Sequence, residues 1–164
     1  MKYFLLIALC VSSFGFSQNT MTNVKLDAIY TTISDSISIE KGRWQFHIEN
    51  TTFLSLTDEN NNRMRIISPV AYVDKLNENV LKEALIANFH TALDVKYAIS
   101  DDILWAIFIH PLKELTIDQV KDAVSQVFYA NANFGTTYAS TSLVFPGKEP
   151  KEEKEEPKPE NKKI

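Results

Sequence analysis

Residues 95–134, VKYAISDDILWAIFIHPLKELTIDQVKDAVSQVFYANANF, decide the fold of this chain. Tyr97 and Ile99 alternate with smaller or polar residues, which predicts a short strand that turns at residues 100–102. Residues 103–109 then form a run that is apolar on both faces. Such a run is typical of a central strand or of a strand that something else covers. We therefore expect a β-hairpin whose apolar faces the rest of the chain must cover.

An amphipathic helix is predicted directly after the hairpin. The residues Thr116-Ile117-Asp118-Gln119 form a capping box, and Leu115 and Val120 are placed as a hydrophobic staple. Gly135 provides a helix end. The expected inner face of this helix consists of Val120, Val124, Val127 and Phe128.

Upstream of the hairpin, the apolar period indicates two further helices and three strands. Residues 20–38 carry a helical stripe, and residues 44–48, 51–57 and 63–68 read as strands, the last ended by Pro69. The polar residues 58–62 form a connection between antiparallel strands. The helical stripe of residues 20–38 consists of Leu26, Ile29, Tyr30, Ile33 and Ile37.

A second helix begins at Asp74 or Asn77, with an expected core stripe of Leu81, Leu85, Phe89 and Ala92. The predicted order is therefore α-β-β-β-α-β-β-α in one domain, residues 18–146. After it, residues 136–145 are β-prone but have no partner visible in the sequence. Residues 147–164 are rich in Lys, Glu and Pro and are expected to be a disordered tail, since they cannot bury enough apolar surface to offset chain entropy.

The first 17 residues are expected to be a secretory signal peptide. Lys2 precedes an apolar run from Tyr3 to Val11, and Gly15 and Ser17 are small residues at the positions that a signal peptidase reads. Cleavage between Ser17 and Gln18 predicts a periplasmic or secreted protein. The apolar run is shorter than the ~20 residues of a spanning helix, so no stable membrane insertion is expected. A short membrane anchor and lipidation at Cys10 are the alternatives.

Composition narrows the chemistry. The chain has 164 residues, a formal net charge of −4 and no basic block, which argues against nucleic acid as a partner. Its single cysteine lies in the expected signal peptide, so the mature chain would hold no thiol for a disulfide, a nucleophile or a metal. Asn50-Thr51-Thr52 is an N-glycosylation sequon, and Ser36 resembles a bacterial O-glycosylation site; both are weak patterns.

No catalytic, cofactor or metal signature is present. His47, His90 and His110 share no metal-ligand spacing, and we expect His110 to hydrogen-bond local backbone. Asp101-Asp102 pairs two carboxylates, but in a tight turn these residues are turn formers. No serine lies in a nucleophile motif, and a chain with four glycines has no phosphate loop. We predict that the protein is not an enzyme and takes no metal or cofactor.

The residues 83–88, EALIAN, and 103–106, ILWA, together with the order of elements, resemble the type III secretion chaperone-like superfamily, including Tir-chaperone and YbjN-type domains. The resemblance covers about residues 20–134. It implies an α+β fold with helices on one face of an antiparallel sheet, frequent dimers, and binding of other proteins without catalysis. Secretion chaperones are cytoplasmic and usually more acidic, so the specific task of keeping an effector unfolded is not carried over.

A sheet with helices on one side leaves its other face to a second subunit, a partner protein or the arm of residues 136–145. An uncovered apolar face of this kind marks an interaction site. We therefore predict an exported, non-enzymatic, chaperone-like module with an unknown protein partner and a homodimer among its expected assemblies. The alternatives are an envelope structural factor acting through the charged tail, and an unrecognised hydrolase. The residues expected on the binding face are Phe53, Ile67, Tyr97, Ile103, Trp105 and Ile107.

Overall fold

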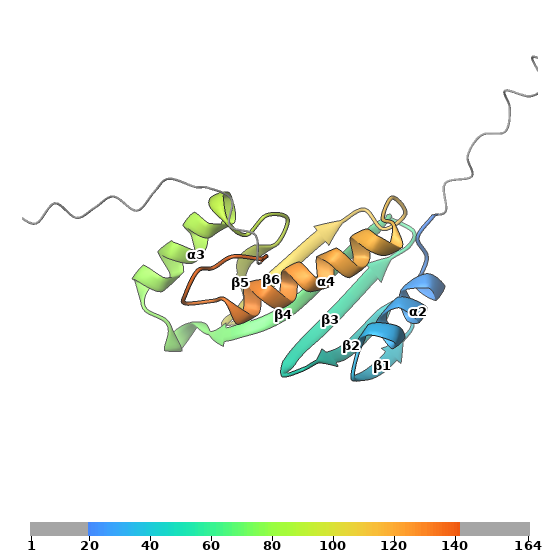
Figure 1. Ribbon diagram of the computed structural model, residues 1–164, viewed down its shortest axis with the longest axis horizontal. Coiled ribbons are helices and arrows are strands. Elements are labelled where there is room, and N and C mark those ends of the chain that lie inside the picture. Colours follow the sequence, from blue (N-terminus) through green and yellow to red (C-terminus); the bar gives the residue numbers. More distant parts are fainter. Residues whose placement is uncertain (1–19, 142–164) are drawn as a thin grey trace, which may run out of the picture.

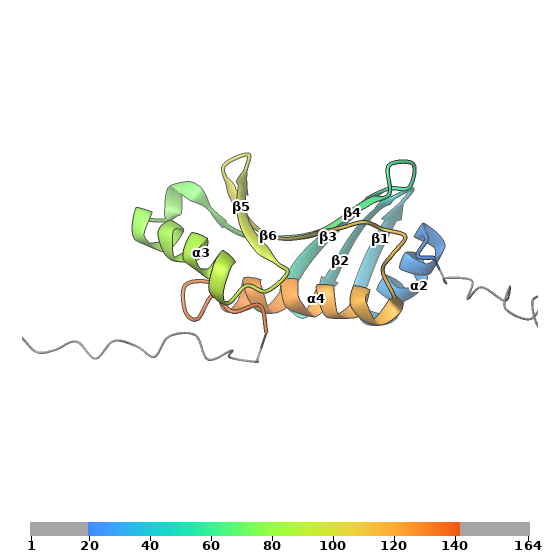
Figure 2. The same ribbon diagram turned by 90° about the horizontal axis from the view of Figure 1, so that it is seen from above.

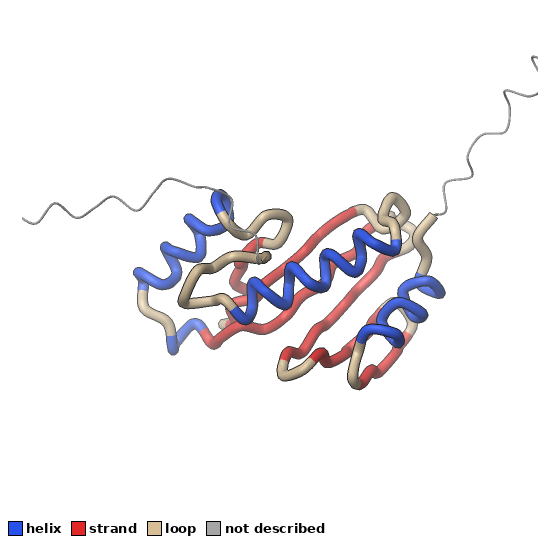
Figure 3. Tube along the Cα trace, viewed as in Figure 1, coloured by secondary structure: helices blue, strands red, loops and turns tan. Residues whose placement is uncertain are grey.

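The computed structural model describes residues 20–141 (Figure 1). The predicted signal peptide and charged tail lie outside these residues. Three α-helices, six strands and a short 3-10 helix make up this part of the chain (Figure 3). In chain order they are α2 (Asn23–Ile33), β1 (Ser36–Glu40), β2 (Arg43–Ile48), β3 (Thr51–Asp58), β4 (Arg63–Tyr72), η1 (Val73–Lys75), α3 (Glu78–His90), β5 (Lys96–Ser100), β6 (Ile103–His110) and α4 (Ile117–Ala132).

All strands join one antiparallel sheet in the order β1-β2-β3-β4-β6-β5. Helix α4 packs along β4 and β6, α2 packs on β1, and α3 lies beside β5 at the far edge. Figure 2 shows the three helices on the same side of the sheet. The predicted α+β architecture, an antiparallel sheet with helices on one face, is confirmed.

The core lies between the sheet and helices α2 and α4. Its aromatic centre is a stack in which Phe46 lies between Tyr30 and Phe53, with ring centroids 4.7 and 5.0 Å apart. Trp44 meets Tyr30 edge-on and donates its indole N–H to Asp27 at 2.6 Å. Helix α4 contributes an apolar face that includes Val120, Val124 and Val127. Aromatic pairs of this kind stabilise the folded chain beyond what the burial of their apolar area contributes.

The first helix is shorter than its apolar stripe predicted, and the sheet gains a strand. Helix α2 ends at Ile33, where the backbone N–H and the hydroxyl of Ser34 both donate to the carbonyl of Tyr30. Ile37 belongs instead to the edge strand β1, where it lies opposite Phe46 of β2. The order therefore begins α-β-β-β-β, because residues Ser36–Glu40 form a strand that pairs with β2.

Pro69 does not end its strand as predicted. Strand β4 continues to Tyr72, and its register against β6 shifts between Pro69 and Ala71. Proline has no N–H to give to the ladder, and a bulge lets the pairing resume beyond it.

Local turn and cap predictions around the hairpin are confirmed. Asp101 and Asp102 both have positive φ, 52° and 59°, as a two-residue hairpin turn between β5 and β6 requires. At the start of α4, the Thr116 hydroxyl accepts the N–H of Gln119, and the Gln119 side chain accepts the N–H of Thr116. The capping box therefore fixes the first turn of α4.

The arm after α4 turns toward the helix side. Tyr138 packs edge-on against Tyr97, and the backbone N–H of Ser140 donates to the carbonyl of Thr91 at 3.2 Å. Within the described residues, the arm therefore reaches the end of α3 and leaves the other face of the sheet uncovered; residues 142–145 lie outside the description.

Candidate protein-binding surface

The face of the sheet that points away from the helices is the candidate site, and we call it the outer face (Figure 2). Side chains alternate between the two faces of a strand, and the buried residues Trp44, Ile66 and Phe108 mark the helix side. Their sequence neighbours point outward. The apolar residues on the outer face are Leu54, Leu56, Ile67, Pro69, Tyr72, Ile103, Trp105, Ile107 and Ile109.

Strand register brings the centre of this face together. Leu54 lies opposite Ile67, Ile67 opposite Ile107, and Pro69 opposite Trp105. These five residues, which we call the outer apolar cluster, span β3, β4 and β6. They are half-buried although no helix in residues 20–141 lies over them. Figure 2 shows that the strands bend so that the outer face is concave. On a concave face neighbouring side chains lie closer together, which accounts for their partial burial.

Trp105 is held in a defined position on this face. Its indole N–H donates to the backbone carbonyl of Ser100 at 3.1 Å, across the β5–β6 hairpin. The only polar atom of the side chain is therefore satisfied within the chain, and the ring offers apolar surface to a partner. A rigid aromatic with few rotatable bonds is well suited to anchor an interface.

Four of the six predicted site residues lie on the outer face, namely Ile67, Ile103, Trp105 and Ile107. The placement of the other two was wrong. Phe53 is fully buried and stacks on Phe46, while Tyr97 is buried and donates its hydroxyl to the carbonyl of Ala130 on α4 at 2.7 Å. Both occupy the helix side of their strands.

The sequence prediction of the binding face did not include Leu54 and Leu56, because a polar residue of β3 is buried in the core. Ser55 lies between them on the opposite face, is 1% exposed, and shares a 2.9 Å hydrogen bond with the hydroxyl of Tyr30. Burial raises the pKa of Tyr30 above its ordinary range. The alternation of β3 alone favours the leucines as core residues. The hydrogen bond with the tyrosine on α2, distant in sequence, lets Ser55 share the buried face with Phe53.

Charged residues border the outer apolar cluster on β2 and β4. Arg43 and Arg65 both lie opposite Leu56, one on each side. Both arginines are exposed. The outer face thus joins a concave apolar centre to a basic margin.

Helix α3 presents a second apolar surface. The predicted core stripe was wrong at two positions: Leu85 is 68% exposed and Phe89 is 87% exposed, and Ile86 beside them is 42% exposed. The residues of this helix that are buried are the small Ala84 and Ala87. The exposed set of Leu85, Ile86 and Phe89 is called the α3 patch below.

An amide clamp explains why α3 shows its large residues outward. The side chain of Asn88 accepts the N–H of Tyr97 at 2.7 Å and donates to its carbonyl at 3.1 Å. This pair of hydrogen bonds places α3 beside the edge of β5 and beyond the sheet face. Large side chains on its far side therefore have no sheet beneath them.

The described residues assemble no catalytic constellation. His47 bonds Ser36 on the outer face, His90 is exposed at the end of α3, and His110 bonds the carbonyl of Pro111 at 2.8 Å, the local contact predicted for it. Between residues 20 and 141, no three His, Cys, Asp or Glu side chains are grouped to hold a metal ion. In the same range, no helix has the length and apolar character needed to cross a membrane.

Comparison with solved structures identifies the fold. A chain in the structure of the HopA1–SchA chaperone–effector complex matches with a TM-score of 0.50 and 12% identity, over 67% of this chain and 95% of that one. A chain in the crystal structure of the ExsC–ExsE complex matches with a TM-score of 0.53 and 11% identity, over 68% and 94%.

No protein-family model and no curated protein matches the chain. The chain shares the fold of the chains matched in these two complexes, and at 11–12% identity the likeness establishes the fold alone.

Proposed function

We propose that this protein is a non-enzymatic, chaperone-like module that binds another protein through its outer face. The observation that carries the proposal is the outer apolar cluster, a concave apolar surface that no helix of the described chain covers. Burying such a surface is favourable at roughly 25 cal/mol for each Å² of apolar area. Similar folds in complexes with partner proteins support the same reading.

Site-directed photocrosslinking tests this function. A benzophenone amino acid replaces Ile107 in the outer apolar cluster, and the matched control replaces Lys121, which is exposed on the opposite side of the molecule. In cells of origin, we expect a discrete adduct from position 107 and none from position 121. The partner protein found in the adduct is then purified, and its affinity for this chain is measured directly.

The affinity measurement decides the outcome. Ile107→Asp places a carboxylate in the apolar contact and is expected to weaken binding at least about tenfold, the size of an interface hot spot. Lys121→Asp should leave the affinity unchanged. Equal adducts from both positions, or an affinity that Ile107→Asp leaves intact in a folded protein, would contradict the proposal.

Export belongs to the proposal as well. The positive start, apolar run and small residues of the first 17 positions support it. Protein purified from its own cells is expected to begin at Gln18 and to lie in the periplasm or the medium. An intact N-terminus on cytoplasmic protein would contradict export and leave the binding proposal standing.

Homodimerisation is proposed through the α3 patch. Leu85 and Phe89 are one helical turn apart and expose most of their surface, an arrangement that two antiparallel copies of α3 can bury against each other. Light scattering at micromolar concentration is expected to show a dimer. Leu85→Glu with Phe89→Glu should yield a folded monomer; a monomeric wild-type chain would contradict this assembly.

The tail offers the competing function of an envelope scaffold. Deleting residues 148–164 separates the two readings, since binding through the outer face does not need the tail. Loss of the crosslinked partner on deletion, with position 107 intact, would favour the scaffold.

A further inference from the structure

The basic margin of the outer face indicates the chemistry of the partner. Register places Arg43 on β2 and Arg65 on β4 directly opposite Leu56 on β3, so the two arginines flank one leucine. Strands in a sheet lie about 4.8 Å apart, which puts the two backbones roughly 10 Å from each other. Leu56 follows Leu54 on the same face, so this pair of arginines adjoins the outer apolar cluster.

Within residues 20–141, neither guanidinium group forms an ion pair. An ion pair between described residues joins Lys75 and Asp74, and it involves neither arginine. Glu40 lies opposite Arg43 at the β1–β2 turn without forming an ion pair.

The other carboxylate on this face belongs to Asp58, which accepts two hydrogen bonds from Asn61, at 3.0 Å from the backbone and 2.7 Å from the side chain. These bonds hold the pKa of Asp58 below its usual range. That carboxylate is already bonded at the β3–β4 turn, so no carboxylate of residues 20–141 forms an ion pair with Arg43 or Arg65.

We propose that the outer face binds an extended peptide segment that carries apolar anchors beside a carboxylate side chain. The anchors pack on the outer apolar cluster, and the carboxylate lies over Leu56 between Arg43 and Arg65. This inference rests on the proposed function and names the partner's chemistry.

Physical chemistry favours this occupant. Two cations flanking a leucine repel each other, and an anion between them relieves that repulsion. Guanidinium groups bind carboxylates through paired, charge-assisted hydrogen bonds. A phosphate backbone would satisfy the arginines but would bring no apolar side chains to Trp105 and Ile107, and the chain's net charge of −4 opposes nucleic acid.

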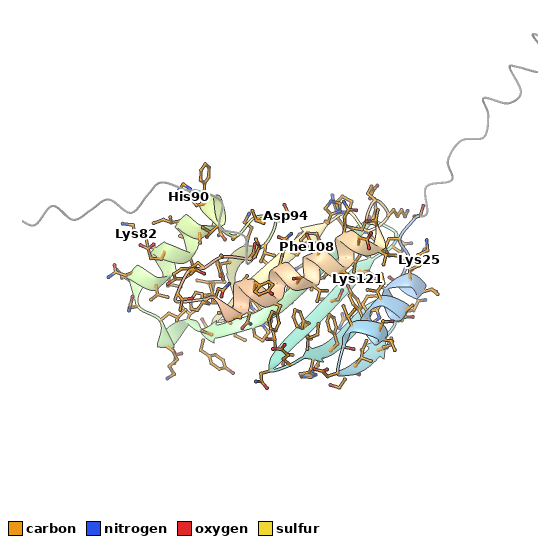
Figure 4. The ribbon with its side chains drawn as sticks, in the orientation of Figure 1. Lys25, Lys82, His90, Asp94, Phe108 and Lys121 are labelled. Atoms are coloured by element: carbon orange, nitrogen blue, oxygen red, sulfur yellow. The ribbon has the colours of Figure 1, made fainter. Side chains whose placement is uncertain are left out.

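Peptide selection on the purified full chain tests the inference without a known partner. A random peptide library is displayed on phage and selected against three proteins. The first is the wild type and the second is the charge-reversed R43E/R65E. The third is K82E/K121E, which changes the net charge equally on α3 and α4 (Figure 4). All four positions are exposed, so the variants should fold, which circular dichroism checks.

The expected result is a charge preference that follows the arginines. Peptides selected on the wild type and on K82E/K121E should carry Asp or Glu next to aromatic or aliphatic residues. Selection on R43E/R65E should replace these acids by Lys or Arg. For a synthetic peptide from the wild-type selection, Glu→Gln should weaken binding roughly tenfold on the wild type, as expected of a hydrogen-bonded charge. The same change should have little effect on R43E/R65E.

The experiment distinguishes failure of this inference from failure of the proposed function. Peptides that lose binding to Ile107→Asp but show no acidic preference would overturn this inference and leave the proposed function intact. Selection of no peptide that depends on Ile107 would overturn both. A labelled single-stranded oligonucleotide that binds the wild type and not R43E/R65E would overturn the inference in favour of a nucleic acid.

Discussion

Removing the hydroxyl of Tyr30 tests the polar contact that decides which face of β3 is buried. The hydroxyl lies 2.9 Å from Ser55 Oγ, and the two residues are 0% and 1% exposed. Tyr30→Phe keeps the ring stacked on Phe46 and leaves the Ser55 hydroxyl buried without a partner. An unsatisfied buried hydroxyl costs about 1–3 kcal/mol, so we expect the free energy of unfolding to fall by that amount.

A double-mutant cycle separates the hydrogen bond from packing. Ser55→Ala leaves the Tyr30 hydroxyl buried without a partner and should lower the free energy of unfolding by a similar amount. The double variant leaves no unsatisfied group, so its cost should be smaller than the sum of the single costs by about 1–2 kcal/mol. Urea unfolding followed by tryptophan fluorescence measures all four proteins. Costs that add to within about 0.5 kcal/mol would refute the coupling.

The loss of folding stability at alkaline pH provides a second test of the contact between Tyr30 and Ser55. Burial raises the pKa of Tyr30 in the folded chain, so the unfolded chain loses this proton first as pH rises past the ordinary value of about 10. The stabilisation is fully present below the pKa of the unfolded chain and is lost progressively as pH rises from that value toward the raised pKa of the folded chain. Tyr97, whose pKa burial also raises, remains in Tyr30→Phe. The variant should therefore show a shallower alkaline loss of stability than the wild type, and an unchanged slope would contradict the assignment.

Three further predictions concern single contacts. Asn88→Ala removes the clamp on Tyr97 and should speed amide hydrogen exchange in α3 but leave α4 protected; equal exchange in both helices would contradict the clamp. Thr116→Ala breaks the capping box of α4 and should cost about 1 kcal/mol in thermal unfolding, whereas Thr116→Ser should retain most of it. Asn61→Ala removes one hydrogen bond to Asp58 and should raise the pKa of that carboxyl toward its ordinary value in an NMR titration; an unmoved pKa would show that the side-chain bond does not stabilise the carboxylate.

The two apolar surfaces suit different tasks. The outer apolar cluster is concave and borders cations, which favours an extended and partly acidic segment. The α3 patch lies on a single helix whose neighbouring faces are polar or buried, which favours a self-complementary contact. Variants at Ile107 and at Leu85 should therefore affect partner binding and self-association separately.

Local signals predicted the parts of the fold whose physics is local. The capping box at Thr116 and the turn at Asp101-Asp102 involve atoms a few residues apart, so residue type and spacing were enough to place them. The same holds for the polar connection predicted at residues 58–62, which the structure places at residues 59–62 between β3 and β4. Apolar periodicity likewise indicated the three α-helices and five of the six strands of residues 20–141.

The faces of the elements needed tertiary contacts. Either Phe53 or its apolar neighbour Leu54 could face the core. The hydrogen bond between the hydroxyls of Tyr30 and Ser55 favours the face that carries Phe53. Leu85 and Phe89 have the spacing of a core stripe, but the clamp from Asn88 sets α3 beside the sheet edge and leaves them exposed.

The sequence by itself determined the α+β class, the β5–β6 hairpin and the α4 cap, because these follow from local hydrogen bonds and hydrophobic period. Only the tertiary structure decided that Trp105 and Ile107 share a concave outer face with Leu54, and that Arg43 and Arg65 flank Leu56. Strand register joins residues that are distant along the chain, and no single-strand pattern encodes which neighbour a strand will receive.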